Sequence, residues 1–270
     1  MIQRPFGSTG IHVSPLGLGT VKLGRNQGVK YPSDFTLPDD TAALALINQA
    51  RELGVNLIDT APAYGSSELR LGQLLRGQRQ HWVICSKVGE EFVDGHSSFD
   101  FSAEHTRASL ERSLRRLNTD VIDLVLVHSD GNDRHIIEQE GTLEQLADLK
   151  REGKIRAFGM STKTVEGGLL AASRSDGVMV TYNLKERAEK PVIDYCAEQG
   201  KGVLIKKALA SGHVCVNANE QDPVQASLDF VLQTTGVTSA IIGTINPDHL
   251  RDNVARATRS LSYIDPCRKT

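Results

Sequence analysis

Short apolar runs alternate with longer amphipathic segments along almost the whole chain. The apolar runs have the length of strands, and the amphipathic segments carry hydrophobic residues at helical spacing, as Leu110, Leu114 and Leu117 do after the capping residue Ser102. Strands are predicted at residues 16–20, 55–59, 82–87, 121–128, 155–159, 178–181, 202–206 and 239–243. Helices are predicted at residues 38–53, 67–76, 142–151, 165–173, 191–199, 223–233 and 247–258, with a further helix that begins at Ser102.

This alternation predicts an α/β fold, a (β/α)8 TIM barrel. Strands that are nearly all apolar are buried on both faces, as in parallel sheets, and eight such units fit the length of a barrel. A doubly wound sheet would need a G-x-G-x-x-G turn, but Gly17-Leu18-Gly19 is followed by Thr20-Val21-Lys22. The first fifteen residues predict an N-terminal β-hairpin. Residues 1–270 are expected to form one domain, with loops at 21–38, 88–101 and 129–141 around the barrel mouth.

Composition and charge narrow the choice of partners. The chain has 270 residues, 39% of them hydrophobic, and a net charge of −2, which does not favour nucleic acid or an acidic membrane as a partner. No apolar run approaches the roughly 20 residues of a membrane helix, and the first residues lack a signal core, so a cytoplasmic protein is expected. The four cysteines have no metal-ligand spacing, so no metal site is predicted.

Three consecutive predicted strands end in an ionisable residue. Asp59, Lys87 and His128 occupy these ends, and Tyr64 follows Asp59 by five residues. In a barrel the strand ends share one mouth, so these four side chains are expected to converge there. Alternation along each strand then places further residues in the barrel interior, namely Leu57 and Val55, Cys85 and Val83, and Leu126, Leu124 and Ile122.

The four residues suit the reduction of a carbonyl group. Hydride addition to carbon leaves negative charge on oxygen, which requires a proton donor and hydrogen bonds. Tyr64 can donate the proton, and a cation such as Lys87 is expected to lower its pKa from about 10. Asp59 would hold the lysine, and a neutral His128 would donate a second hydrogen bond to the substrate oxygen.

Asp, Tyr, Lys and His in this order resemble the catalytic tetrad of the aldo-keto reductases. The resemblance covers nearly the whole chain, and its other motifs are Gly19-Thr20, Asp59 to Gly65, Asp120 to Leu124, Gly153 to Arg156, Tyr182-Asn183 and Ile242 to Pro247. It implies an NAD(P)H-dependent oxidoreductase that reduces a small aldehyde or ketone. The implied cofactor is NADP, with NAD as the alternative.

The resemblance also assigns residues to the cofactor and the substrate. The implied cofactor residues are Gly19, Thr20, Asp59, Ser161, Thr162, Met179, Lys206, Leu209, Gly243, Thr244, Asn246, His249 and Asn253, and the implied substrate residues are Val21, Tyr31, Tyr64 and His128. Several of these depart from the family pattern. Thr162 replaces an asparagine, Met179 a glutamine and Lys206 an aromatic residue. Gly243 and His249 replace the cations that bind the 2′-phosphate, for which Arg251 is a substitute.

Two other functions remain open at this stage. An aldolase-like lyase would use Lys87, Lys206 or Lys207 as a Schiff base in the same fold. A carboxylate beside Lys87 argues against that lysine, because it keeps the amine charged. The second alternative is a non-catalytic module that senses nucleotides. Measurable turnover of an activated aldehyde that is lost in a Tyr64→Phe variant would exclude this alternative.

Overall fold

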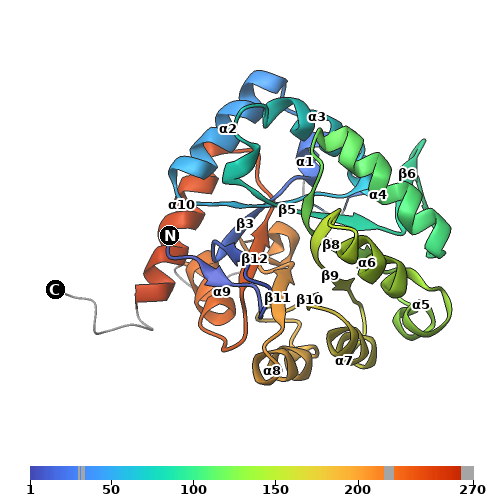
Figure 1. The fold of residues 1–270 in the computed structure, drawn as a ribbon. Helices are drawn as coiled ribbons and strands as arrows, with labels where there is room; N and C mark the ends of the chain where they lie inside the picture. The colour runs from blue at the N-terminus through green and yellow to red at the C-terminus, as the bar shows by residue number, and fades with distance from the viewer. Residues whose placement is uncertain (30, 32–33, 216–221, 263–270) are drawn as a thin grey trace.

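Eight parallel strands form a closed barrel in the computed structural model, which describes residues 1–29, 31, 34–215 and 222–262 (Figure 1). The order around the barrel is β3, β4, β5, β8, β9, β10, β11 and β12, and β12 pairs with β3 to close it. The predicted (β/α)8 fold is confirmed. The strands are β3 (Leu16–Gly19), β4 (Leu57–Asp59), β5 (Val83–Val88), β8 (Ile122–His128), β9 (Ile155–Ser161), β10 (Gly177–Thr181), β11 (Gly202–Lys206) and β12 (Ser239–Ile242).

Helices surround the strands, as Figure 1 shows. Several begin at a side chain that accepts a backbone N–H of the first turn: Asp39 accepts from Ala42, and Ser102 accepts from His105. Such caps stabilise a helix by about 1 kcal/mol each. The outer helices are α2 (Asp40–Glu52), α3 (Ser67–Leu74), α4 (Ala103–Leu117), α6 (Thr142–Arg151), α7 (Val165–Arg174), α8 (Lys190–Glu198), α9 (Pro223–Leu232) and α10 (Pro247–Ser262).

Alternation along the strands divides the apolar residues into two layers. Ile58, Ile84 and Val125 belong to the layer between strands and helices. The barrel interior holds the residues expected there, among them Leu57, Val83, Cys85, Leu124 and Leu126. The inward assignments of Val55 and Ile122 are wrong. Val55 precedes the first residue of β4, Ile122 is the first residue of β8, and both pack in the outer layer.

An N-terminal hairpin, β1 (Arg4–Pro5) and β2 (His12–Val13), packs against the barrel interior and confirms the predicted hairpin. Phe6, Ile11 and Val13 join the interior cluster, and Phe6 is only 1% exposed. The ring lies against Gly202, where a Cβ atom would come within 2.4 Å of it. Because Gly202 begins β11, the hairpin covers the end of the barrel opposite the strand carboxyl ends.

The three connections predicted as loops contain regular structure. The first contains α1 (Val21–Gly24), the second a hairpin of β6 (Glu90–Val93) and β7 (His96–Phe99), and the third α5 (Asp133–Gln139). Helix α1 is too short for a periodic signal, and α5 is fixed by contacts to residues distant in sequence. Residues 30, 32–33 and 263–270, which belong to the predicted mouth walls and tail, lie outside the described residues.

Three 3-10 helices complete the described structure: η1 (Pro62–Tyr64), η2 (Arg79–His81) and η3 (Ala210–Cys215). Helix η1 matters most for the site, because it follows β4 directly and carries Tyr64. Across the part of the chain that the structure describes, no helix is both long and apolar enough to cross a bilayer.

Candidate active site

Asp59, Lys87 and Tyr64 meet at the carboxyl ends of β4 and β5. The Lys87 amine lies 2.5 Å from Asp59 Oδ1 and 3.1 Å from the Tyr64 hydroxyl, and it also donates to the Thr60 carbonyl at 3.0 Å. The Tyr64 hydroxyl lies 3.4 Å from Asp59 Oδ2. Lys87 is 1% exposed. A buried ammonium therefore links a carboxylate to a phenol, as the sequence predicts.

The protonation of this cluster follows from burial and charge. Burial alone would lower the pKa of Lys87, but Asp59 and the other acidic neighbours outweigh it and raise that pKa above its ordinary value. Burial and the Asp59 carboxylate also raise the pKa of Tyr64, and Lys87 offsets only part of this rise. The expected lowering by Lys87 is thus present, but burial and Asp59 outweigh it, and the pKa of Tyr64 lies above its ordinary value. Tyr64 is a protonated phenol at neutral pH.

His128 lies at the end of β8 beside the tyrosine. The two rings meet edge to face, with centroids 6.2 Å apart. His128 Nδ1 lies 2.7 Å from Glu90 Oε2, close in distance but without the alignment of a good hydrogen bond. Burial lowers the pKa of His128, with Glu90 acting against this shift and Lys87 adding to it. The site thus includes a carboxylate, Glu90, that sequence reasoning missed.

The ends of β9 and β11 form the opposite side of the mouth. Lys206 donates to Ser161 Oγ at 2.9 Å and to the Thr162 carbonyl at 2.7 Å. The Thr162 hydroxyl instead faces Glu189, at 3.4 Å from Oε1. Ser161 and Lys206 therefore offer a hydroxyl and an amine to a polar group such as a carboxamide, whereas the Thr162 side chain is directed away.

The predicted nucleotide residues gather around the start of α10. Asn246 caps this helix, because its side-chain oxygen accepts from the backbone N–H groups of Asp248 at 2.8 Å and His249 at 3.2 Å. Arg251, the substitute for a phosphate-binding cation, lies 2.7 Å from Asp248. Gly243 and His249 are exposed, Asn253 is half-buried and Thr244 is buried. The start of α10 is therefore exposed to a ligand, and the charge of Arg251 there is balanced by Asp248.

Of the remaining predicted cofactor residues, Gly19, Thr20 and Met179 are buried and Leu209 is half-buried. Gly19 ends β3, and Thr20 is fully buried, with its hydroxyl donating to the Asp59 carbonyl at 2.9 Å. Met179 belongs to the barrel interior, and Leu209 packs against the outer layer. Thr20 thereby ties the end of β3 to the end of β4 and positions the strand that carries Asp59.

Val21 and Tyr31, the predicted substrate residues, come from the connection after β3. Val21 begins α1 and is half-buried. The Lys22 amine lies 4.1 Å from the centre of the Tyr31 ring. The Tyr31 hydroxyl lies 3.2 Å from the point that a Cβ atom on Gly243 would occupy. Burial and the Asp59 carboxylate raise the pKa of Tyr31. This tyrosine thus extends toward both Gly243 and Asp59.

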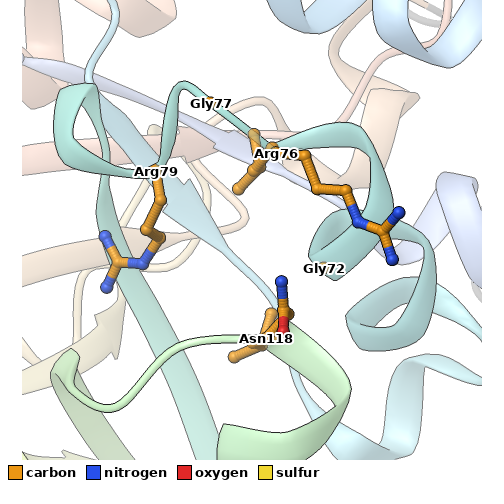
Figure 2. Close-up of a pocket in the computed structure, with 7 residues that line it drawn as sticks. Gly72, Arg76, Gly77, Arg79 and Asn118 are labelled. Carbon is orange, nitrogen blue, oxygen red and sulfur yellow. The ribbon is translucent and has the colours of Figure 1, made fainter.

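A small pocket elsewhere does not belong to this constellation. It is lined by residues of the connections that lead into β5 and β8, at the end of the barrel away from the mouth: Gly72, Leu75, Arg76, Gly77, Arg79, Leu117 and Asn118. Figure 2 shows the guanidinium groups of Arg76 and Arg79 pointing away from each other. Arg79 is also paired with Asp123 at 2.8 Å. The two cations therefore do not form a joint anion site.

Comparisons with known proteins, by family model, by sequence and by structure, agree on one family. The model of the "Aldo/keto reductase family" matches residues 15–215. The NADH-specific methylglyoxal reductase of Escherichia coli is 31% identical, over 98% of this chain and 96% of that protein. L-galactose dehydrogenase of Arabidopsis thaliana is 27% identical, over 94% of this chain and 88% of that protein. A solved structure from Pseudomonas aeruginosa, assigned to the aldo-keto reductases, is 61% identical with a TM-score of 0.88, over 96% and 95%. The holo form of AKR11C1 from Bacillus halodurans is 25% identical with a TM-score of 0.80, over 98% and 96%. The chain belongs to the aldo/keto reductase family.

Proposed function

We propose that this protein reduces the carbonyl group of a small aldehyde or ketone with a nicotinamide cofactor, and that Tyr64 is the proton donor. The observation that carries the proposal is the Lys87 amine, 2.5 Å from Asp59 and 3.1 Å from the Tyr64 hydroxyl. Family membership supports the reaction class. The geometry supports the assignment of roles to the side chains.

The reduced cofactor, when bound, supplies hydride to the carbonyl carbon. The substrate oxygen lies between the Tyr64 hydroxyl and His128 and gains negative charge as the hydride arrives. Tyr64 donates its proton to that oxygen, and Lys87 stabilises the resulting phenolate through its 3.1 Å contact. Asp59 keeps Lys87 charged and oriented. Val21 and Tyr31 form part of the substrate wall.

In this proposal, the Ser161 side of the mouth would hold the nicotinamide end of the dinucleotide, and residues at the start of α10 would hold its adenosine end. Gly243, Thr244, Asn246 and Asn253 border its adenosine end, where the backbone at a helix start favours phosphate. We propose NADPH as the cofactor on family grounds. One observation favours NADH as a second candidate: Arg251 is already paired with Asp248 at 2.7 Å, and that carboxylate would repel a 2′-phosphate. Titration of the protein with both reduced dinucleotides decides between them.

The test of the reaction is a Tyr64→Phe variant assayed against a panel of aldehydes. Removing one hydroxyl from a half-buried ring leaves the packing intact, so loss of the proton donor is expected to lower kcat/KM by about 10²- to 10⁴-fold. A Tyr195→Phe variant on α8, which is remote from the mouth, is the matched control. Near-normal turnover by Tyr64→Phe would refute the role of this residue.

The lyase alternative has a separate readout. A Schiff base on Lys87, Lys206 or Lys207 would be trapped by borohydride in the presence of a carbonyl substrate and would add mass to one lysine. We expect no adduct on Lys87, because Asp59 keeps that amine protonated. Turnover that needs no dinucleotide and is abolished when borohydride traps an adduct on one lysine would favour the lyase.

A further inference from the structure

The Lys206 amine brings an unpaired cation into the mouth. It is held by two neutral acceptors, Ser161 Oγ at 2.9 Å and the Thr162 carbonyl at 2.7 Å. Ser161 is the register partner of His128 on the neighbouring strand. The amine therefore lies one hydrogen bond away from a residue adjacent to the proposed proton-transfer site.

No carboxylate among the described residues forms an ion pair with this amine. The acidic groups that act on it are Glu189, which precedes α8, and Asp133, which begins α5, and both are engaged elsewhere. Glu189 accepts from the Thr181 backbone N–H at 2.7 Å, and Asp133 accepts from the Lys163 backbone N–H at 2.9 Å. The positive charge of Lys206 is therefore not neutralised by an ion pair among these residues, and it acts on a ligand bound in the mouth.

The proposed placement of the nicotinamide on the Ser161 side of the mouth would bring the ring close to this charge. A hydride donor must approach the carbonyl carbon to about 3–3.5 Å, and the carbonyl oxygen lies between Tyr64 and His128. A ring held on the Ser161 side of that position would face the Lys206 amine, which donates to Ser161 Oγ at 2.9 Å and whose charge already acts on His128. The reduced ring is neutral, whereas the oxidised ring carries a positive charge. The two redox forms therefore interact differently with the same lysine.

We infer that Lys206 disfavours the oxidised, positively charged nicotinamide, so that the protein binds the reduced dinucleotide more tightly than the oxidised one and releases the latter readily. This inference rests on the proposed function, because it assumes a nicotinamide nucleotide in this mouth. At a separation of about 6 Å and an effective dielectric constant of about 20, such repulsion corresponds to a ten- to hundredfold difference in dissociation constant.

The effect also has an expected pH dependence. Burial lowers the pKa of Lys206 to about 8, Lys163 and Lys207 add to this shift, and Glu189 and Asp133 oppose it. Below that pH the amine is charged and repels the oxidised ring. Above it the amine is neutral and the repulsion disappears. His128, the other titratable group on this side, has a lowered pKa and is neutral over that interval.

The experiment is calorimetric titration of the wild-type protein and a Lys206→Met variant with the oxidised and the reduced dinucleotide at pH 6.5 and 9.5. At pH 6.5 the ratio of the two dissociation constants, oxidised over reduced, is expected to fall at least tenfold in Lys206→Met. In the wild-type protein it is expected to fall similarly between pH 6.5 and 9.5. Lys206→Arg keeps the charge and is expected to retain the preference at both pH values.

Lys207→Met is the matched control, because this adjacent lysine has a side chain that is 46% exposed and lies 4.0 Å from Glu186. It is expected to keep the wild-type ratio. The wild-type pH series needs no variant, so it decides the question even where Lys206→Met folds poorly. Tight binding of both dinucleotides with a ratio that neither pH nor Lys206→Met changes would overturn this inference and leave the proposed function standing. Binding of neither dinucleotide would overturn both.

Discussion

The carboxylate of Glu90, 2.7 Å from His128 Nδ1, favours a proton on that nitrogen. Burial works to raise the pKa of Glu90, but His128, Ser97 and Arg25 outweigh it and lower that pKa to about 2, so Glu90 is ionised at neutral pH. Two acceptors 2.7 Å apart would repel each other, so the proton of a neutral ring lies on Nδ1. The other nitrogen, Nε2, then carries a proton only in the imidazolium form. A neutral His128 therefore does not donate a hydrogen bond from Nε2, which differs from the neutral donor that the sequence predicts.

A Glu90→Gln variant tests this assignment through its pH profile. Burial lowers the pKa of His128 from 6.5, so its doubly protonated form is lost as pH rises through a value below 6.5. Wild-type kcat/KM for reduction, at saturating cofactor, is expected to fall about tenfold per unit above that value up to pH 8. A glutamine amide can donate to Nδ1 and leave the proton on Nε2, so the fall should flatten. Glu144→Gln, at an exposed position on α6, is the control that should keep the wild-type slope, and an unchanged slope in Glu90→Gln would contradict the assignment.

At the residue scale, the sequence predicts which side chains meet when those side chains lie at strand ends. Asp59, Lys87 and His128 each terminate an apolar run, so the barrel rule brings them together without further information. Glu90 was missed because its position depends on the hairpin that follows β5. The Thr162 hydroxyl was assigned to the cofactor, but it faces Glu189, and no local pattern records that direction.

The hairpin of β6 and β7 is the element that positions Glu90 beside His128. Its Asp94-Gly95 turn has φ angles of 50° and 83°, which suit a tight hairpin turn, and such an Asp-Gly pair is the sequence signal that could have predicted it. The Glu91 carboxylate accepts from Ser109 at 3.1 Å and pairs with Arg112, both on α4. The eight main strands and helices were predictable because their own periodicity defines them. The hairpin and α5 depend more on contacts with other elements.

Weakening the contacts between Glu91 and α4 is expected to affect catalysis more than stability. In Glu91→Gln the charged pairing with Arg112 is lost, at a cost of about 1 kcal/mol because Glu91 is 19% exposed. The melting temperature should fall by about 2–4 °C. Because Glu90 precedes this residue on the same strand, we expect kcat to fall about three- to tenfold with KM for the cofactor unchanged. A large loss of stability with unchanged kcat at 25 °C would show that the hairpin serves only the fold.

At the scale of the whole molecule, the barrel separates the groups of the candidate active site from those that close its other end. The site lies at the strand carboxyl ends, and the N-terminal hairpin covers the opposite end with Phe6, which is 1% exposed. Packing at that end bears on stability, whereas the proposed reaction takes place at the mouth. Phe6 fits there because Gly202 has no Cβ atom, which would lie 2.4 Å from the ring.

A Phe6→Ala variant should therefore destabilise the protein without altering its chemistry. Removing a fully buried ring costs about 3–5 kcal/mol, which corresponds to a fall in melting temperature of about 6–20 °C for a chain of this size. Well below the new melting temperature, kcat and the cofactor dissociation constant should equal those of the wild-type protein. Circular dichroism melts and assays at 20 °C measure the two quantities separately. Phe6→Leu, which fills most of the same space, should show a smaller loss of stability. A lowered kcat in Phe6→Leu, with the fold intact, would mean that the closed end and the mouth are mechanically coupled, because no Phe6 atom belongs to the site.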